Sequence, residues 1–82
     1  MAKGIHDARY QKVIKALKAA RIAHKLSQAT VAERLGKPQQ FVSKYESGER
    51  RLDVVEFMDV ARVLDVDPQA LLKGMTNPIS KA

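Results

Sequence analysis

Apolar side chains recur every three or four residues along almost the whole chain, and no segment alternates apolar and polar residues with a period of two. The first spacing places apolar side chains on one face of a helix, whereas alternation is typical of a half-buried strand. The pattern therefore predicts an all-α fold. With 82 residues we expect a single domain and exclude a two-domain enzyme, because chains divide into several domains only beyond about 250 residues. The domain is expected over residues 8–74, between an N-terminal arm (1–7) and a C-terminal tail (75–82).

Residues that begin and end helices divide the chain into five expected helices, over residues 8–23, 27–35, 38–48, 54–64 and 67–72. Asp7 and Ser27 are of the types that cap helix N-termini, and Gly36 supplies a left-handed residue at a helix end. Asp53 with Glu56 three residues later resembles a capping box. The third expected helix has Pro38 in its first turn and ends at Gly48.

The fourth expected helix carries more apolar residues than one core face needs. Its core stripe is expected to contain Val54, Phe57, Val60, Ala61 and Leu64, which leaves Val55, Met58 and Val63 outside it. Together with Leu72 and Met75, Val55 and Met58 form a candidate dimer interface, since two-fold symmetric dimers are the commonest oligomers. The alternative is that these apolar side chains are scattered and exposed singly.

Positive charge is concentrated in the first two thirds of the chain. Residues 1–52 carry twelve Lys or Arg and four acids, a net +8, whereas residues 53–82 carry three and five, a net −2. Such asymmetry favours a polyanionic partner, most often nucleic acid, although many small domains are basic only for solubility. The absence of cysteine excludes a disulfide scaffold and indicates a reducing, cytoplasmic compartment. No apolar stretch approaches the roughly 18 residues of a membrane span.

The sequence contains no pattern typical of an enzyme, metal or cofactor site. His6 and His24 are the only histidines and lie far apart in the sequence. Neither has a third metal ligand at suitable spacing, and no glycine-rich phosphate loop or paired nucleophile and base is present. We therefore expect no catalytic residues, no metal and no cofactor.

The most specific pattern lies between Gln28 and Tyr45. Counting Gln28 as position 1, Ala32, Gly36, Val42 and Tyr45 occupy positions 5, 9, 15 and 18. A small Ala32 lets two helices approach, Gly36 allows a tight turn, and the two apolar residues seat the second helix on the first. This spacing predicts a helix-turn-helix motif.

The order of features from Lys18 to Leu72 resembles the Cro/CI-type phage-repressor family, also called XRE-type regulators. The stretches that carry the resemblance are KAARIAHKLSQATVAERLGKPQQFVSKYESGERRL and VARVLDVDPQALL. The resemblance implies a compact five-helix lambda-repressor-like domain. It also implies binding to operator DNA as a homodimer, with the helix over residues 38–48 in the major groove. One departure is Lys25, where the family commonly has glycine; a left-handed lysine there would be strained by about 1 kcal/mol.

The outward face of the helix over residues 38–48 suits recognition of base edges. With Val42, Tyr45 and Glu46 facing inward, the outward residues carry amide, hydroxyl and amine groups that pair with adenine or guanine edges. The candidate base contacts are Gln39, Gln40, Ser43, Lys44 and Ser47. The alternative for these residues is an ordinary solvated helix face.

Four further residues are candidate contacts to DNA phosphate. Gln28 begins the second expected helix, where free amides attract an anion, and the family uses this glutamine for phosphate contact. Lys37, Arg50 and Arg51 flank the third expected helix and would add affinity without sequence preference. Their alternative is a solvated basic loop, and Arg50 has the further option of pairing with Glu49.

Arg21 and Glu46 receive a structural interpretation. Both lie on inward faces of their helices, and in the family these positions are joined by a partly buried ion pair. That pair would tie the first expected helix to the third and hold the latter in place.

Three functions are compatible with these features. The first is a sequence-specific DNA-binding transcriptional regulator, expected to be a repressor that binds a pseudo-palindromic operator as a homodimer. The second is an antitoxin that binds its own promoter and a toxin through an additional apolar surface. The third is a helical protein-interaction module without DNA binding, against which the polar helix face and the basic region count.

Overall fold

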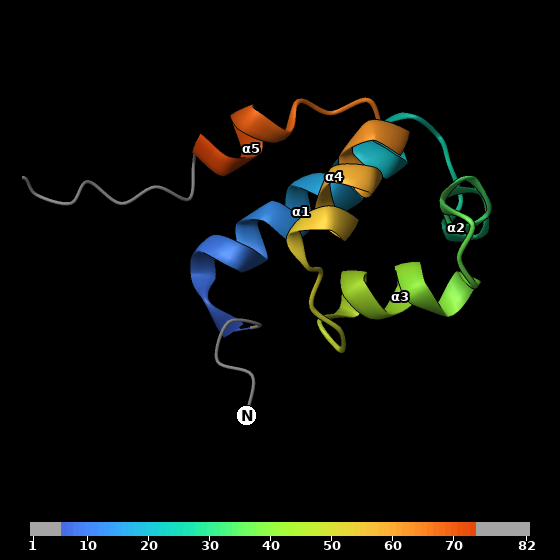
Figure 1. The fold of residues 1–82 in the computed structure, drawn as a ribbon, viewed down its shortest axis with the longest axis horizontal. Coiled ribbons are helices and arrows are strands. Elements are labelled where there is room, and N and C mark those ends of the chain that lie inside the picture. Colours follow the sequence, from blue (N-terminus) through green and yellow to red (C-terminus); the bar gives the residue numbers. More distant parts are fainter. Residues whose placement is uncertain (1–5, 74–82) are drawn as a thin grey trace, which may run out of the picture.

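The computed structural model describes residues 6–73, and their regular secondary structure is helical (Figure 1). The helices are α1 (Ala8–Ala23), α2 (Gln28–Leu35), α3 (Gln39–Ser47), α4 (Val54–Val63) and α5 (Pro68–Lys73). The predicted all-α fold and its five helices are therefore confirmed. Residues 1–5 and 74–82, and with them the predicted tail, lie outside the described residues.

The capping residues predicted from the sequence set the helix starts. The side chain of Asp7 accepts from the Arg9 amide, and that of Ser27 accepts from the Thr30 amide. Asp53 and Glu56 form a reciprocal capping box at the start of α4. Pro38 is the N-cap of α3 and not part of its first turn. Its missing N–H costs nothing there, because the first amides of a helix have no intrahelical partner.

Four helices are each followed by a residue in the left-handed backbone conformation. Gly36 ends α2 with φ 69° and Gly48 ends α3 with φ 86°. Lys25 and Asp65 adopt φ 58° and 56° after α1 and α4, although neither is a glycine. At each end an amide reaches back five residues, as from Leu26 to the Arg21 carbonyl at 3.0 Å, which is the bond of a Schellman motif. The left-handed Lys25 therefore carries the strain of about 1 kcal/mol expected for such a residue.

The core lies where α1, α2, α3 and α4 converge. The fully buried side chains include Leu17, Val31, Val42, Tyr45, Val60 and Leu64. Two assignments from the sequence were wrong. Val54 is 70% exposed, because it is the first residue of α4 and lies at the rim of an open pocket. Val63 is half-buried and packs against the core instead of lying outside it.

The hydroxyl of Tyr45 is buried but has no hydrogen-bond partner among residues 6–73. Burial raises the pKa of this phenol. A buried polar group without a partner costs about 1 to 3 kcal/mol. We therefore expect Tyr45→Phe to raise the free energy of unfolding by about 1 kcal/mol, measured by urea denaturation.

Tyr10→Phe is the matched control for this substitution, because the Tyr10 hydroxyl accepts from the Leu52 amide at 3.0 Å. Losing that bond is expected to lower the free energy of unfolding by about 1 kcal/mol. A loss of stability in both variants would mean that the Tyr45 hydroxyl is also satisfied in solution.

Candidate nucleic-acid interface

The α2–α3 pair is built by a short turn between closely packed helices. Gly36 ends α2, and the Lys37 amide returns to the Ala32 carbonyl at 2.9 Å. Ala32 is 2% exposed, and Val42 and Tyr45 are fully buried. The small side chain at Ala32 therefore allows the close approach of α3 that the spacing predicted, and α3 presents its opposite face to solvent.

The outward face of α3 carries the five residues predicted to contact bases. Gln39, Gln40, Lys44 and Ser47 are exposed, and Ser43 is half-buried. The two serine hydroxyls donate to carbonyls of the preceding turn, Ser43 to Gln40 and Ser47 to Lys44, each at 3.2 Å. Within the described part of the chain, the side chains of Gln39, Gln40 and Lys44 have no hydrogen bond or ion pair, so their polar groups are available to a ligand.

Glu46 on the inner side of α3 is the centre of a polar network. Its carboxylate accepts from Arg21 Nε at 2.7 Å and from Arg21 Nη2 at 3.0 Å, so the predicted ion pair is present. The side chains of Arg21 and Glu46 are only 12% and 3% exposed. The hydrogen bond to Glu46 raises the pKa of the Arg21 guanidinium. This pair joins α1 to α3, as the sequence interpretation required.

Gln28 belongs to the same network, which the sequence did not reveal. Its Nε2 donates to Glu46 Oε1 at 3.0 Å. One amide donor of Gln28 is therefore used within the protein instead of being free for a phosphate. The helical spacing gave no signal for this contact, because it depends on how α2 and α3 cross.

The ion-pair partner of Arg50 differs from the one that the sequence suggested. Arg50 does not pair with Glu49 but with Glu56, at 2.9 Å to one carboxylate oxygen and 2.7 Å to the other. Its guanidinium also lies 4.9 Å from the centre of the Phe41 ring. Glu56 is within reach because the chain turns into α4 between the two residues. Nη1 and Nη2 of Arg50, a predicted phosphate contact, are therefore bonded within the protein.

Lys37 and Arg51 are the exposed cations at the two ends of α3. Both side chains are free of ion pairs within residues 6–73. Lys37 Nζ lies 5.4 Å from the centre of the Phe41 ring. Phe41 is buried, and its ring packs edge-on against Tyr45. The two predicted phosphate contacts therefore remain available to a ligand.

The Arg50–Glu56 pair predicts an acid-sensitive contribution to stability. Its hydrogen bonds lower the pKa of Glu56 from 4.5 to about 2. A carboxylate with a lowered folded-state pKa stabilises the protein fully above pH 4.5 and progressively less as the pH falls towards 2. Because Arg50 is 41% exposed, solvent screening reduces this contribution to about 1 kcal/mol.

Urea denaturation at pH 7 and pH 3 measures this effect. The wild type is expected to lose about 1 kcal/mol more than Glu56→Gln between the two pH values. Asp7, whose pKa is also lowered by Arg9, is present in both proteins and cancels in the comparison. Equal losses would mean that the pair is too well solvated to contribute.

The described residues hold neither a metal cluster nor a membrane-spanning segment. Among residues 6–73, no group of three or more His, Cys, Asp or Glu side chains is arranged to hold a metal ion. No helix of this part of the chain is both long and apolar enough to cross a bilayer.

Comparison with known proteins places this helix pair in a family. The helix-turn-helix family model matches residues 17–71, more than half of the chain. The fold also matches the solved structure of an XRE-family like protein from Pseudomonas syringae pv. tomato str. DC3000. The TM-score is 0.80, the identity is 53%, and 89% of each chain is covered. The protein belongs to the XRE family of helix-turn-helix proteins.

A curated HTH-type relative extends the similarity. The chain is 36% identical over 61 residues to an uncharacterized HTH-type transcriptional regulator, YqaE, from Bacillus subtilis strain 168. The aligned part is 74% of this chain but 53% of YqaE, so the chain spans about half the length of that relative. The family match includes every residue predicted to contact DNA, whereas Leu72 and Met75 of the predicted dimer interface lie beyond it.

Proposed function

We propose that the protein is a sequence-specific DNA-binding regulator of transcription that inserts α3 into the major groove. The observation that supports this most strongly is the outward face of α3. Gln39, Gln40 and Lys44 are exposed and their side chains make no bond to residues 6–73. The inner face of the same helix is fixed by Val42, Tyr45 and the Arg21–Glu46 pair. A firmly held helix that presents unused polar groups is what direct base recognition requires.

The contacts divide into two kinds. Gln39, Gln40, Ser43, Lys44 and Ser47 would read base edges, since amide and amine groups match adenine and guanine. Lys37 and Arg51 would neutralise phosphates on either side of the groove and add salt-sensitive affinity. Gln28 would contact phosphate through the second N–H of its Nε2, the one not donated to Glu46. Regulation would be repression where the bound site overlaps a promoter.

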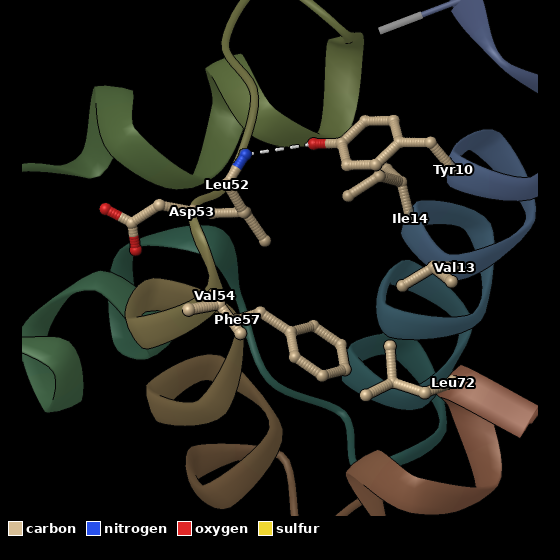
Figure 2. Close-up of a pocket in the computed structure, with 8 residues that line it drawn as sticks. All are labelled: Tyr10, Val13, Ile14, Leu52, Asp53, Val54, Phe57 and Leu72. Atoms are coloured by element: carbon tan, nitrogen blue, oxygen red, sulfur yellow. Dashed lines mark hydrogen bonds between the residues drawn. The ribbon is translucent and has the colours of Figure 1, made fainter. Parts of the chain in front are cut away.

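We further propose that the regulator binds as a homodimer through α4 and α5. Val55 is 66% exposed, Met58 47% and Leu72 41%. Beside them is an apolar pocket of about 210 Å³ that Val54 also lines, where Leu72 lies opposite the Phe57 ring (Figure 2). Met75, also predicted for this interface, lies outside the described residues. A two-fold dimer would space two α3 helices about 34 Å apart and would select a pseudo-palindromic operator.

Selection of bound duplexes from a random pool tests the proposal. The selected duplex and a scrambled control are then titrated by fluorescence anisotropy at two salt concentrations, with the mass of the complex from sedimentation. A two-fold-related site bound at least ~10³ tighter than the control, by two copies of the chain, is the expected result.

Other outcomes would favour the remaining functions. Weak, salt-sensitive binding without an enriched site would favour an antitoxin that needs its toxin for full DNA affinity. Absent or salt-insensitive binding would favour a protein-interaction module and would contradict the proposal.

A further inference from the structure

The connection between α3 and α4, residues 48–53, is fixed to the domain at almost every residue. The amides of Glu49 and Arg50 both donate to the Lys44 carbonyl, at 2.9 and 3.2 Å. These two bonds fasten the first half of the connection to the end of α3. A loop anchored in this way has few ways to move relative to the helix it follows.

The second half is fastened to two other helices. The Leu52 amide donates to the Tyr10 hydroxyl of α1 at 3.0 Å, as Figure 2 shows, and the Leu52 side chain is buried. The Asp53 amide donates to Glu56 Oε1 of α4 at 2.9 Å. The connection is therefore held between α1, α3 and α4.

Arg50 lies at the centre of this arrangement and bonds to the protein through both terminal nitrogens of its guanidinium. It donates to both Glu56 oxygens and, through Nη1, to the Arg51 carbonyl at 3.2 Å. Its Cζ also lies over the Phe41 ring of α3. These contacts need the flat, forked geometry of a guanidinium, which an ammonium group does not provide.

The side chain of Arg51, unlike that of Arg50, is available to a ligand. The carbonyl of Arg51 is held by Arg50, but its side chain is exposed and makes no hydrogen bond or ion pair with residues 6–73. The backbone of this residue is thus fixed while its charge is free. Fixing the backbone lowers the entropy that is lost when the side chain meets a ligand.

We propose that Arg50 and Glu56 are positioning residues that direct the Arg51 side chain towards a DNA phosphate, so that Arg50 acts on DNA only through Arg51. The inference rests on the proposed DNA-binding function. It differs from the prediction that Arg50 is itself a phosphate contact; in that account, Glu56 would compete with phosphate for Arg50. The two accounts differ in the expected effect of lysine at position 50, since lysine contacts phosphate well as a point charge but cannot form the forked pair.

A double-mutant cycle on the selected duplex tests the inference. Arg50→Lys is expected to weaken binding about 5-fold in the wild-type protein and to have almost no effect in the Arg51→Ala protein, because residues that act as a unit are not additive. Arg51→Ala alone is expected to shallow the salt slope by about 0.9, the value for one phosphate. An equal effect of Arg50→Lys in both backgrounds, or no effect in either, would overturn the proposal.

Glu56→Gln provides a second measurement, because the two accounts predict opposite changes in DNA affinity. Glutamine keeps the acceptor of the capping box but removes the charge that holds Arg50. The matched control is Glu49→Gln, which removes an exposed carboxylate from the same connection. We expect Glu56→Gln to weaken DNA binding about 3-fold relative to that control, the usual worth of a partly exposed ion pair. Tighter binding than the control would mean that Glu56 competes with phosphate for Arg50.

Hydrogen exchange in the DNA-free protein separates failure of this inference from failure of the proposed function. Arg50→Lys is expected to speed exchange of the Leu52 amide about 10-fold, whereas Glu49→Gln leaves it unchanged. If the wild type binds no duplex but exchange speeds up, DNA binding fails while the anchoring role stands. If the wild type binds DNA but neither exchange nor the cycle responds, the positioning role alone is wrong.

Discussion

Arg21→Ala is expected to lower the free energy of unfolding by about 3 to 5 kcal/mol, the cost of removing one partner from a buried ion pair. The substitution would leave the Glu46 carboxylate, 3% exposed, with Gln28 as its one remaining side-chain donor among the described residues. An amide does not compensate a buried negative charge as a guanidinium does. For a domain of this size, such a loss removes a large part of the total stability.

Urea denaturation followed by circular dichroism measures this loss, and the chain supplies a matched control. Arg62 forms a single 3.4 Å contact with Asp59, and both side chains are well exposed, at 76% and 45%. Arg62→Ala is therefore expected to change the free energy of unfolding by less than about 0.5 kcal/mol. If Arg21→Ala were as mild as Arg62→Ala, the link between α1 and α3 would be electrostatically unimportant.

The Arg21–Glu46 pair also connects stability to recognition. Glu46 lies on the inner side of α3, the helix whose outer side carries Gln40 and Lys44. Its carboxylate also accepts a hydrogen bond from Gln28 at the start of α2. The carboxylate thus fixes α3 relative to both α1 and α2. A variant that loses this link without unfolding is expected to lose discrimination between DNA sites as well, since base contacts depend on the placement of the helix.

The sequence predicted the helices well because their boundaries depend on local chemistry. Each capping residue acts within one or two turns of the helix end that it caps, so local spacing is sufficient to place that end. These residues are Ser27, Gly36, Gly48 and the Asp53–Glu56 box. Val54 was assigned to the core because periodicity does not report where neighbouring helices end. It does lie on α4 as expected, but no element among residues 6–73 covers that end of the helix.

The missed polar contacts depend on geometry that no spacing rule contains. Arg50 and Glu56 are six residues apart and separated by a helix start, so neither the i,i+3 nor the i,i+4 rule for helix pairs applies. Gln28 and Glu46 come from different helices, and their contact depends on the crossing of α2 and α3. The Arg21–Glu46 pair was predicted from the family resemblance together with the inward faces of the two helices.

Gln40→Ala and Lys44→Ala are each expected to reduce discrimination between the selected duplex and other sequences by about 1 to 3 kcal/mol, the worth of one base contact. Both side chains are exposed on α3 and have no internal partner among residues 6–73, so their removal costs the fold little. The measurement is the ratio of dissociation constants for the selected duplex and for duplexes with single substitutions. Each variant should relax preference at one position of the site.

Matched controls come from helices that are not expected to enter the groove. Lys15→Ala on α1 removes the same charge as Lys44→Ala, and Gln69→Ala on α5 removes the same amide as Gln40→Ala, both from exposed positions. These controls should keep full discrimination, although Lys15→Ala would weaken binding to every duplex if α1 lies near the DNA backbone. If the α3 variants discriminated as well as their controls, the outward face of α3 would not be the surface that reads DNA.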